Sequence, residues 1–191
     1  MKSNWKWIYN PFEKVAGWKA FGIGILLLTI ATVMGYFGNT VFYGLEVKVV
    51  STITWSMAFF LQALGLVVLV AMMYAAALFF ARHVRFQDIL GTITLAKYPL
   101  LLMAVLNLAL NKSVSSIDIN KLISRDFSLL DILPLFLFGI FAVLLLVWEI
   151  ALLYNAFRVS TNLKGTKCAV LFTAALLVSE IITIILVFVI Y

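Results

Sequence analysis

Three ionisable side chains stand inside long apolar stretches of this 191-residue sequence: Lys97, Glu149 and Glu180. A charge placed in bilayer hydrocarbon costs roughly 2.5–3.5 kcal/mol on insertion scales, so each of these groups needs a partner or a role. Lys97 and Glu149 each lie about eight residues from the same end of the membrane, which is ~12 Å deep at about 1.5 Å per helical residue. Their matched depth makes an ion pair between two helices feasible.

Two interpretations of Lys97 and Glu149 stay open. In the first, they form a buried pair that lines a polar cavity. In the second, Lys97 extends to the lipid headgroups, while Glu149 bonds to a neighbouring Tyr, Asn or Ser. The second is simpler, because snorkelling is common and matched depths arise by chance. Pro99 is close to the level of Lys97, and it is expected to release the carbonyl of Leu95 and to kink its helix.

Glu180 is the most unusual of the three residues, because it lies about 13 residues into its stretch, near the middle of the membrane. A side chain at that depth cannot reach the headgroups, so it must be protonated, paired or in contact with a wet cavity. Gln62, Asn107 and Asn155 are further candidates for the same interior. Hydrogen bonding between neighbouring helices is the alternative explanation for these three amides.

The elements that carry these side chains are predicted to be membrane-spanning helices. The sequence is 65% hydrophobic and 12% charged, against roughly a quarter charged in an average soluble protein. A span needs ~20 apolar residues, and five stretches qualify: 20–43, 55–81, 89–110, 129–157 and 168–191. They are too long for barrel strands and lack strict alternation. We therefore expect an all-α, polytopic membrane bundle with a single domain.

Lysine and arginine residues predict the orientation of the bundle. If the stretches span in turn, ten of the 14 basic residues lie on one side of the membrane and four on the other. Since basic residues favour the cytoplasmic side, we expect a cytoplasmic N-terminus and an external C-terminus, in a bacterial inner membrane. The sole cysteine, Cys168, is expected to be a free thiol at a membrane border.

The N-terminal segment carries its own helix signals. Asn10 could cap a helix with Pro11 at its first position, and Glu13 could close a capping box. Either a short amphipathic helix lies on the cytoplasmic face, or the first span starts early. Three tryptophans in this region are candidate interface anchors: Trp5, Trp7 and Trp18.

The fourth helix has two candidate starts. Ser128 could cap it, with Asp131 at the positive end of its dipole, or Pro134 could mark the true start of the span. The preceding connection, 111–128, is partly apolar and is expected to lie against the outer interface.

Several short motifs resemble the Yip1-domain family, particularly its short bacterial-type members. They are Asn10-Pro11-Phe12-Glu13, the run from Gly91 to Pro99, the run from Tyr154 to Val159, and Leu163-Lys164-Gly165. The resemblance covers most of the chain and implies a five-span fold with a cytosolic N-terminus. Eukaryotic relatives are associated with Rab GTPases and vesicle traffic, but they have a long cytosolic N-terminal region and an Asp-Leu-Tyr-Gly-Pro-like motif. This chain has neither, so that role does not transfer.

Familiar catalytic and binding motifs are missing from the sequence. His83 is the only histidine, which argues against a histidine-based metal cluster, and no cofactor is expected. There is no nucleophile elbow, phosphate-binding loop or dinucleotide fingerprint. The basic residues are scattered singly, which argues against nucleic acid. Membrane lipids and other membrane proteins are the expected partners, with the oligomeric state open.

Three functional hypotheses follow. The first is a non-catalytic membrane scaffold or adaptor of the Yip1 type. The second is a small transporter or channel that uses Lys97, Glu149 and Glu180. The third, an enzyme acting on lipid headgroups, has no support from any residue. Convergence of the three charges on one water-accessible cavity would favour transport, and dispersal would favour the scaffold.

Overall fold

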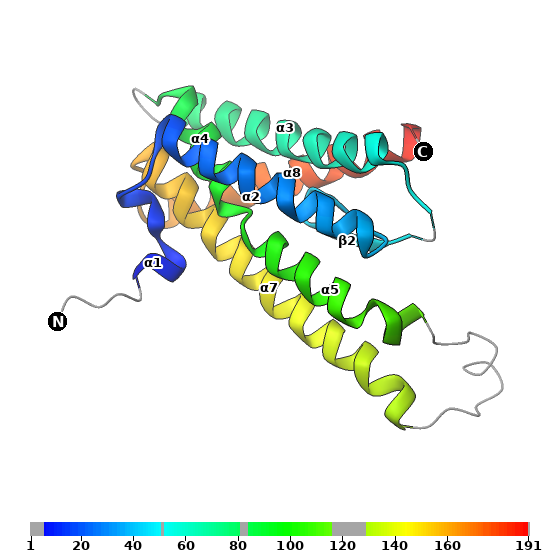
Figure 1. The fold of residues 1–191 in the computed structure, drawn as a ribbon. Coiled ribbons are helices and arrows are strands. Elements are labelled where there is room, and N and C mark those ends of the chain that lie inside the picture. Colours follow the sequence, from blue (N-terminus) through cyan, green and yellow to red (C-terminus); the bar gives the residue numbers. More distant parts are fainter. Residues whose placement is uncertain (1–5, 51, 81–83, 116–128, 191) are drawn as a thin grey trace.

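The computed structural model describes residues 6–50, 52–80, 84–115 and 129–190. Within these ranges, five helices are long and apolar enough to cross a membrane: Gly17–Phe37, Trp55–Phe80, Phe86–Ala109, Phe136–Thr161 and Gly165–Ile190. Their number and type confirm the predicted all-α, multi-pass membrane bundle. Figure 1 shows the arrangement of the helices.

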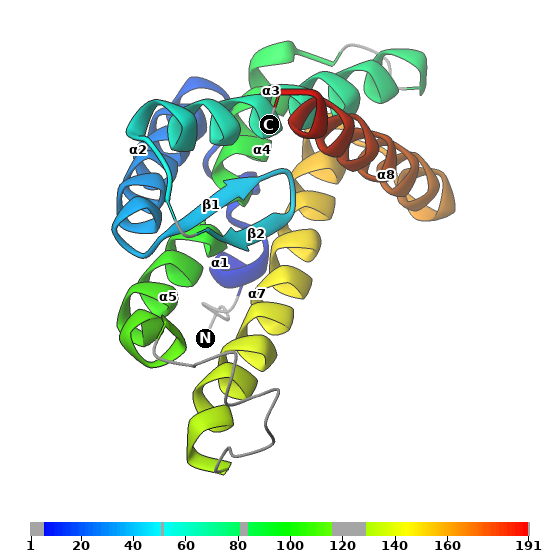
Figure 2. The same ribbon diagram turned by 90° about the vertical axis from the view of Figure 1, so that its right-hand side faces the viewer.

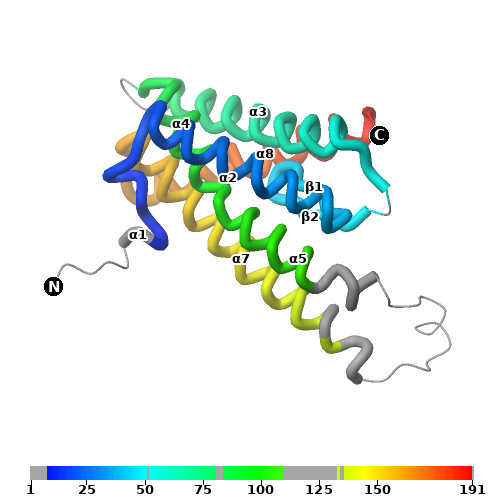
Figure 3. Tube along the Cα trace, in the orientation of Figure 1, coloured from blue at the N-terminus to red at the C-terminus, as the bar shows by residue number. Residues whose placement is uncertain are grey.

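The bundle is built around α4 (Phe86–Ala96), which contacts α2 (Gly17–Phe37), α3 (Trp55–Phe80) and α7 (Leu129–Thr161). Helix α8 (Gly165–Ile190) packs against α3, while α5 (Pro99–Ser115) packs against α2 and α7. Figure 2 shows that α7 and α8 diverge from each other. The start of α2 and the last turns of α8 lie at opposite ends of the bundle, as the trace in Figure 3 shows.

The third span is broken at Pro99, as predicted. Helix α4 ends at Ala96, and α5 begins at Pro99. Proline has no N–H to continue the helical ladder. The carbonyl of Leu95 instead accepts a hydrogen bond from the Tyr98 N–H at 3.1 Å. Lys97 therefore lies at a helix break rather than in the middle of a continuous helix.

The first span is shorter than predicted, because residues 38–43 do not continue the helix. Helix α2 ends at Phe37, and the chain forms an antiparallel hairpin from β1 (Thr40–Tyr43) and β2 (Glu46–Val49). Two features favour this departure. Asn39 has a φ of 53°, which ends the helical path, and the residues of β1 are all β-branched or aromatic. An apolar run alone cannot distinguish such a strand from helix.

From residue 6 onward, the N-terminal segment forms no amphipathic helix, and the first span begins at Gly17, three residues before the predicted start at Ala20. The segment contains one helical turn, α1 (Lys6–Tyr9), and one 3₁₀ turn, η1 (Pro11–Glu13). The Asn10 amide donates to the Glu13 carboxylate at 2.9 Å and makes no capping bond to the backbone. Glu13 is therefore part of a tight local turn rather than of a helix start. Because Gly17 has a φ of 60°, α2 begins as a separate helix.

The predicted interface residues are only partly described. Trp18 is 63% exposed at the start of α2, while Trp5 and the side chain of Trp7 lie outside the described residues. Cys168 is buried and unpaired with another cysteine. Helix α7 begins at Leu129, so Pro134 lies within it and does not mark its start. Residues 116–128 also lie outside the described ranges.

Candidate functional site

Lys97 is fully buried at the break between α4 and α5. Its Nζ lies 2.8 Å from Glu149 Oε1 of α7, and both side chains are at most 3% exposed. The same Nζ donates a hydrogen bond to the carbonyl oxygen of Gly44 at 2.5 Å. Lys97 therefore does not snorkel to the headgroups, and the structure shows the ion pair instead. The pair joins two spanning helices to the hairpin.

Glu149 borders a cavity of about 190 Å³ between the hairpin, α5 and α7. Leu45 and Val47 of the hairpin form one wall, and Pro99 and Met103 of α5 contribute to another. The other lining residues are apolar, so Glu149 is the ionisable residue among those that line this cavity. The fully buried Lys97 holds the carboxylate from its other side.

Glu180 approaches the same hairpin from α8. Its Oε2 accepts a hydrogen bond from the Leu45 N–H at 3.0 Å. Its Oε1 is buried and has no hydrogen-bond partner among the described residues. Glu180 interacts electrostatically with both Lys97 and Glu46, the latter at the start of β2. Its carboxylate therefore has one oxygen bonded to the turn and one without a hydrogen-bond partner among the described residues.

Lys97 and Glu180 both bind one backbone turn, Gly44-Leu45, and Glu149 is linked to it through Lys97. Of these three residues only Glu149 lines the cavity. The Gly44 carbonyl accepts from Lys97, and the Leu45 N–H donates to Glu180. With four residues per strand at ~3.3 Å each, the hairpin is ~13 Å long, close to half of the ~30 Å hydrocarbon thickness. Non-helical backbone inside a membrane bundle needs protein partners for its polar groups. Here the side chains of Lys97 and Glu180 supply these partners.

Two glycines allow the tip to enter the bundle. Gly44 has a φ of 56° at the first of the two loop residues, which is the position where a type II′ hairpin turn takes glycine. Gly65 of α3 faces this turn so closely that a Cβ there would lie 2.2 Å from the Gly44 nitrogen. The hairpin therefore lies directly against the bare backbone of α3.

Asn107 anchors the open end of the hairpin. Its Nδ2 donates to the Gly38 carbonyl at 2.7 Å and also contacts the Thr40 hydroxyl. Of the other predicted amides, Asn155 donates to the Tyr9 carbonyl at 2.9 Å. The Oε1 of Gln62 is buried and has no partner among the described residues. Neither Asn155 nor Gln62 belongs to the charged cluster at the turn.

The residues that the sequence analysis missed are those of the turn itself. Thr-Val-Phe-Tyr and Glu-Val-Lys-Val flank Gly44-Leu45, and two β-rich runs separated by a Gly-X pair are a hairpin signal. The signal was hidden because the first run continues an apolar stretch long enough to read as helix. Within the described ranges, no group of three or more His, Cys, Asp or Glu side chains is placed to hold a metal ion.

The fold and the cluster define a multi-pass membrane protein with a hairpin that re-enters its helical bundle. Comparisons with protein-family models, with curated proteins and with solved structures gave no match to this chain. The resemblance to Yip1-domain proteins therefore stays a prediction from short motifs.

Proposed function

We propose that this chain is a small membrane transporter in which Glu180 binds and releases a proton, while Lys97 and Glu149 act as fixed charges. One arrangement supports the proposal. Lys97 and Glu180, from two spanning segments, bind a single re-entrant turn, and Glu149 from a third segment pairs with Lys97. Ionisable groups at membrane depth are typical of proton and ion pathways. Substrate sites in transporters also commonly form where a spanning helix is interrupted near the midplane.

The charge balance favours Glu180 as the group that changes its protonation. Lys97 has one positive charge, which Glu149 neutralises at 2.8 Å. Glu180 is then the second carboxylate near one ammonium, and its Oε1 has no hydrogen-bond partner among the described residues. A proton on this oxygen would neutralise the excess charge without breaking the Leu45 contact.

Proton flux in reconstituted vesicles tests this proposal. Purified protein would be placed in liposomes that contain a pH-sensitive dye, and an inside-negative potassium diffusion potential would be applied. Wild-type vesicles should acidify several-fold faster than empty ones, and Glu180→Gln should acidify at the empty-vesicle rate. Gly139→Ala is the control, because no atom lies within 4 Å of a Cβ at that position. Flux at the empty-vesicle rate in the wild type would refute the transport function.

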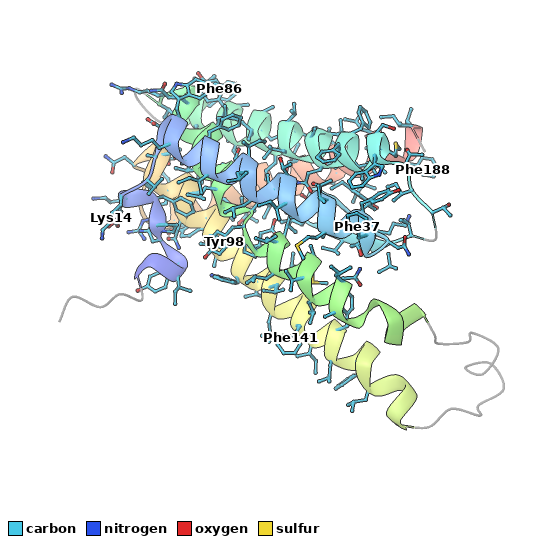
Figure 4. All side chains as sticks on the ribbon, in the orientation of Figure 1. Lys14, Phe37, Phe86, Tyr98, Phe141 and Phe188 are labelled. Atoms are coloured by element: carbon cyan, nitrogen blue, oxygen red, sulfur yellow. The ribbon has the colours of Figure 1, made fainter. Side chains whose placement is uncertain are left out.

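The scaffold hypothesis keeps one specific observation in its favour. Only 17% of the spanning window of α7, Phe136–Thr161, is buried within the chain, against 67% for Phe86–Ala109. Phe141 lies on this span, 47% exposed, and is labelled in Figure 4. A partner helix would cover such a face, as expected for a Yip1-type adaptor. A photocrosslinking amino acid at Phe141 should then give discrete protein adducts in native membranes, whereas lipid adducts alone would argue against an adaptor.

We also propose the orientation with the N-terminus in the cytoplasm and the C-terminus outside, in a bacterial inner membrane. Lys14, Arg85 and Lys164 occupy connections at one end of the bundle, while Lys48 belongs to the hairpin at the other end. That asymmetry follows the positive-inside rule. No catalytic activity is proposed. A reporter active only in the cytoplasm should work when fused to the N-terminus and fail when fused after Tyr191.

A further inference from the structure

A groove of about 410 Å³ runs between α2 and α3, and Phe86 and Leu90 of α4 line one of its ends. It forms because α2 packs chiefly against α4 and α5, while α3 packs chiefly against α8, so that α2 and α3 touch each other only lightly. Phe59 marks one end of the groove, and Phe86, labelled in Figure 4, marks the other. Its volume lies within the ~300–1,000 Å³ range of small-molecule sites.

Gln62 points to a ligand in this groove. The residue lines the groove, is only 7% exposed, and its Oε1 has no hydrogen-bond partner among the described residues. A buried amide oxygen without a donor costs roughly 1–3 kcal/mol. Thr29, the other polar side chain of the groove, cannot relieve this cost, since its hydroxyl donates to the Ile25 carbonyl at 2.8 Å. No donor to this oxygen is found among the described residues, so the oxygen is open to a donor from a bound molecule.

Water fits this site poorly. A buried water needs two to four polar partners, whereas Gln62 and Thr29 are the polar residues among the thirteen that line the groove, and the Thr29 hydroxyl already donates to Ile25. An apolar chain, by contrast, would cover the walls along their whole length. From Phe59 to Ala71 the groove follows α3 for ~18 Å, at about 1.5 Å per residue.

The depth of Gln62 indicates which end of the ligand it would meet. It lies seven residues after Trp55, or ~10 Å from the start of α3. Since the 26-residue helix is ~39 Å long and hydrocarbon is ~30 Å thick, Gln62 is ~6 Å inside the nearer hydrocarbon boundary. The polar end of a lipid lies just above that level, with its tail directed along the groove toward Phe86.

We propose that this groove binds a single-chain lipid with a free hydroxyl next to its polar end, and that this hydroxyl donates to the Gln62 amide oxygen. The acyl chain packs between Ile25 of α2 and Val67 of α3. An ester lipid that lacks a donor would gain the apolar contacts but would leave Gln62 unsatisfied. Binding is therefore selective for the hydroxyl, and it does not depend on the charged cluster at the hairpin.

Competition between two matched lipids tests the proposal. Radiolabelled 1-oleoylglycerol would be titrated into the purified protein in detergent, and unlabelled 1-oleoylglycerol or methyl oleate would displace it. We expect saturable binding of about one lipid per chain. Methyl oleate should compete ~3–10-fold more weakly, the factor that corresponds to one net hydrogen bond. Equal competition by the two lipids, or binding that never saturates, would overturn the proposal with the wild-type protein alone.

Variants separate the hydrogen bond from the apolar groove. Gln62→Leu should abolish the preference for the hydroxyl while it retains binding of the chain. Val67→Trp should fill the groove and reduce the binding of both lipids at least tenfold. Its matched control is Val147→Trp, because Val147 of α7 is 60% exposed and Val67 is 65% exposed. A Gln62→Leu protein that kept the full preference, or equal losses in both tryptophan variants, would refute the site.

Discussion

The Gly65 Cα of α3 faces the nitrogen of Gly44 at the tip of the hairpin, so closely that a Cβ at Gly65 would be 2.2 Å from that nitrogen. The neighbouring atom is backbone and cannot rotate away. Gly65→Ala should therefore push the hairpin out of the bundle and destabilise the protein by at least about 1–3 kcal/mol, the usual cost of overpacking. Thermal unfolding in detergent measures this loss.

Glycine positions with open surroundings provide the control for that experiment. A Cβ at Gly22 or at Gly139 would meet no atom within 4 Å. Alanine at either position should leave the unfolding temperature unchanged or raise it slightly, because alanine favours helix. An equal loss at Gly22 and Gly65 would mean that the hairpin contact has no special importance.

Gly44 should tolerate alanine poorly for two separate reasons. Its φ of 56° is strained for any residue with a Cβ, and that atom would lie 2.5 Å from Glu180 Oε2. Gly44→Ala should therefore displace Glu180 and reduce stability by about 1–3 kcal/mol. Adding Glu180→Ala should restore the part due to the clash but not the part due to backbone strain. If the double variant lost as much stability as the two single variants lose together, the predicted clash would be disproved.

Lys97 and Glu149 should show strong coupling in a double-mutant cycle. Removal of one partner leaves the other charge buried and alone, at a cost of about 3–5 kcal/mol. Lys97→Met and Glu149→Leu should each be strongly destabilising. The double variant should lose much less unfolding free energy than the sum of the two single losses. Denaturant unfolding of the four proteins in detergent gives the coupling energy. Additive effects would show that the two side chains act independently.

Asn107 should stabilise the open end of the hairpin. Asn107→Leu removes the donor to the Gly38 carbonyl and to the Thr40 hydroxyl, and it leaves the Gly38 carbonyl with the longer bond from the Thr40 hydroxyl at 3.2 Å. The expected cost is about 0.5–1.5 kcal/mol, the usual net contribution of a hydrogen bond. Hydrogen exchange should report faster exchange at β1 amides than in wild type, with little change in α8. Unchanged exchange in β1 would refute this role for Asn107.

Much of this architecture could be predicted from residue patterns, because lipid imposes simple requirements on length and apolarity. Continuous apolar stretches identified the spanning helices, and Pro99 identified the break in the third of them. The pairing of Lys97 with Glu149 was one of two stated alternatives. Depth along a helix can be counted from sequence, but the rotation of each helix about its axis cannot, and that rotation decides whether two side chains meet.

The hairpin could not be predicted by the same reasoning. Residues 40–43 are apolar enough to extend a span, and the features that redirect them are tertiary. They include the bare surface at Gly65 and a lysine and a glutamate from distant helices that bind the turn. Propensity toward strand is weak until such partners are present. The prediction of an amphipathic helix in the N-terminal segment was wrong for a similar reason, since the burial of Phe12 outweighs the local helix signals.

The bond between Leu45 and Glu180 joins residues 135 positions apart in the chain. A ribosome that has just delivered the hairpin to the membrane has therefore not yet made the helix that completes its binding site. Until α8 is inserted, the Leu45 N–H lacks the acceptor that Glu180 supplies. The hairpin is therefore expected to become fully packed only after the last helix is inserted. A chain truncated before that helix should keep its hairpin accessible to proteases, whereas the full-length chain should protect it.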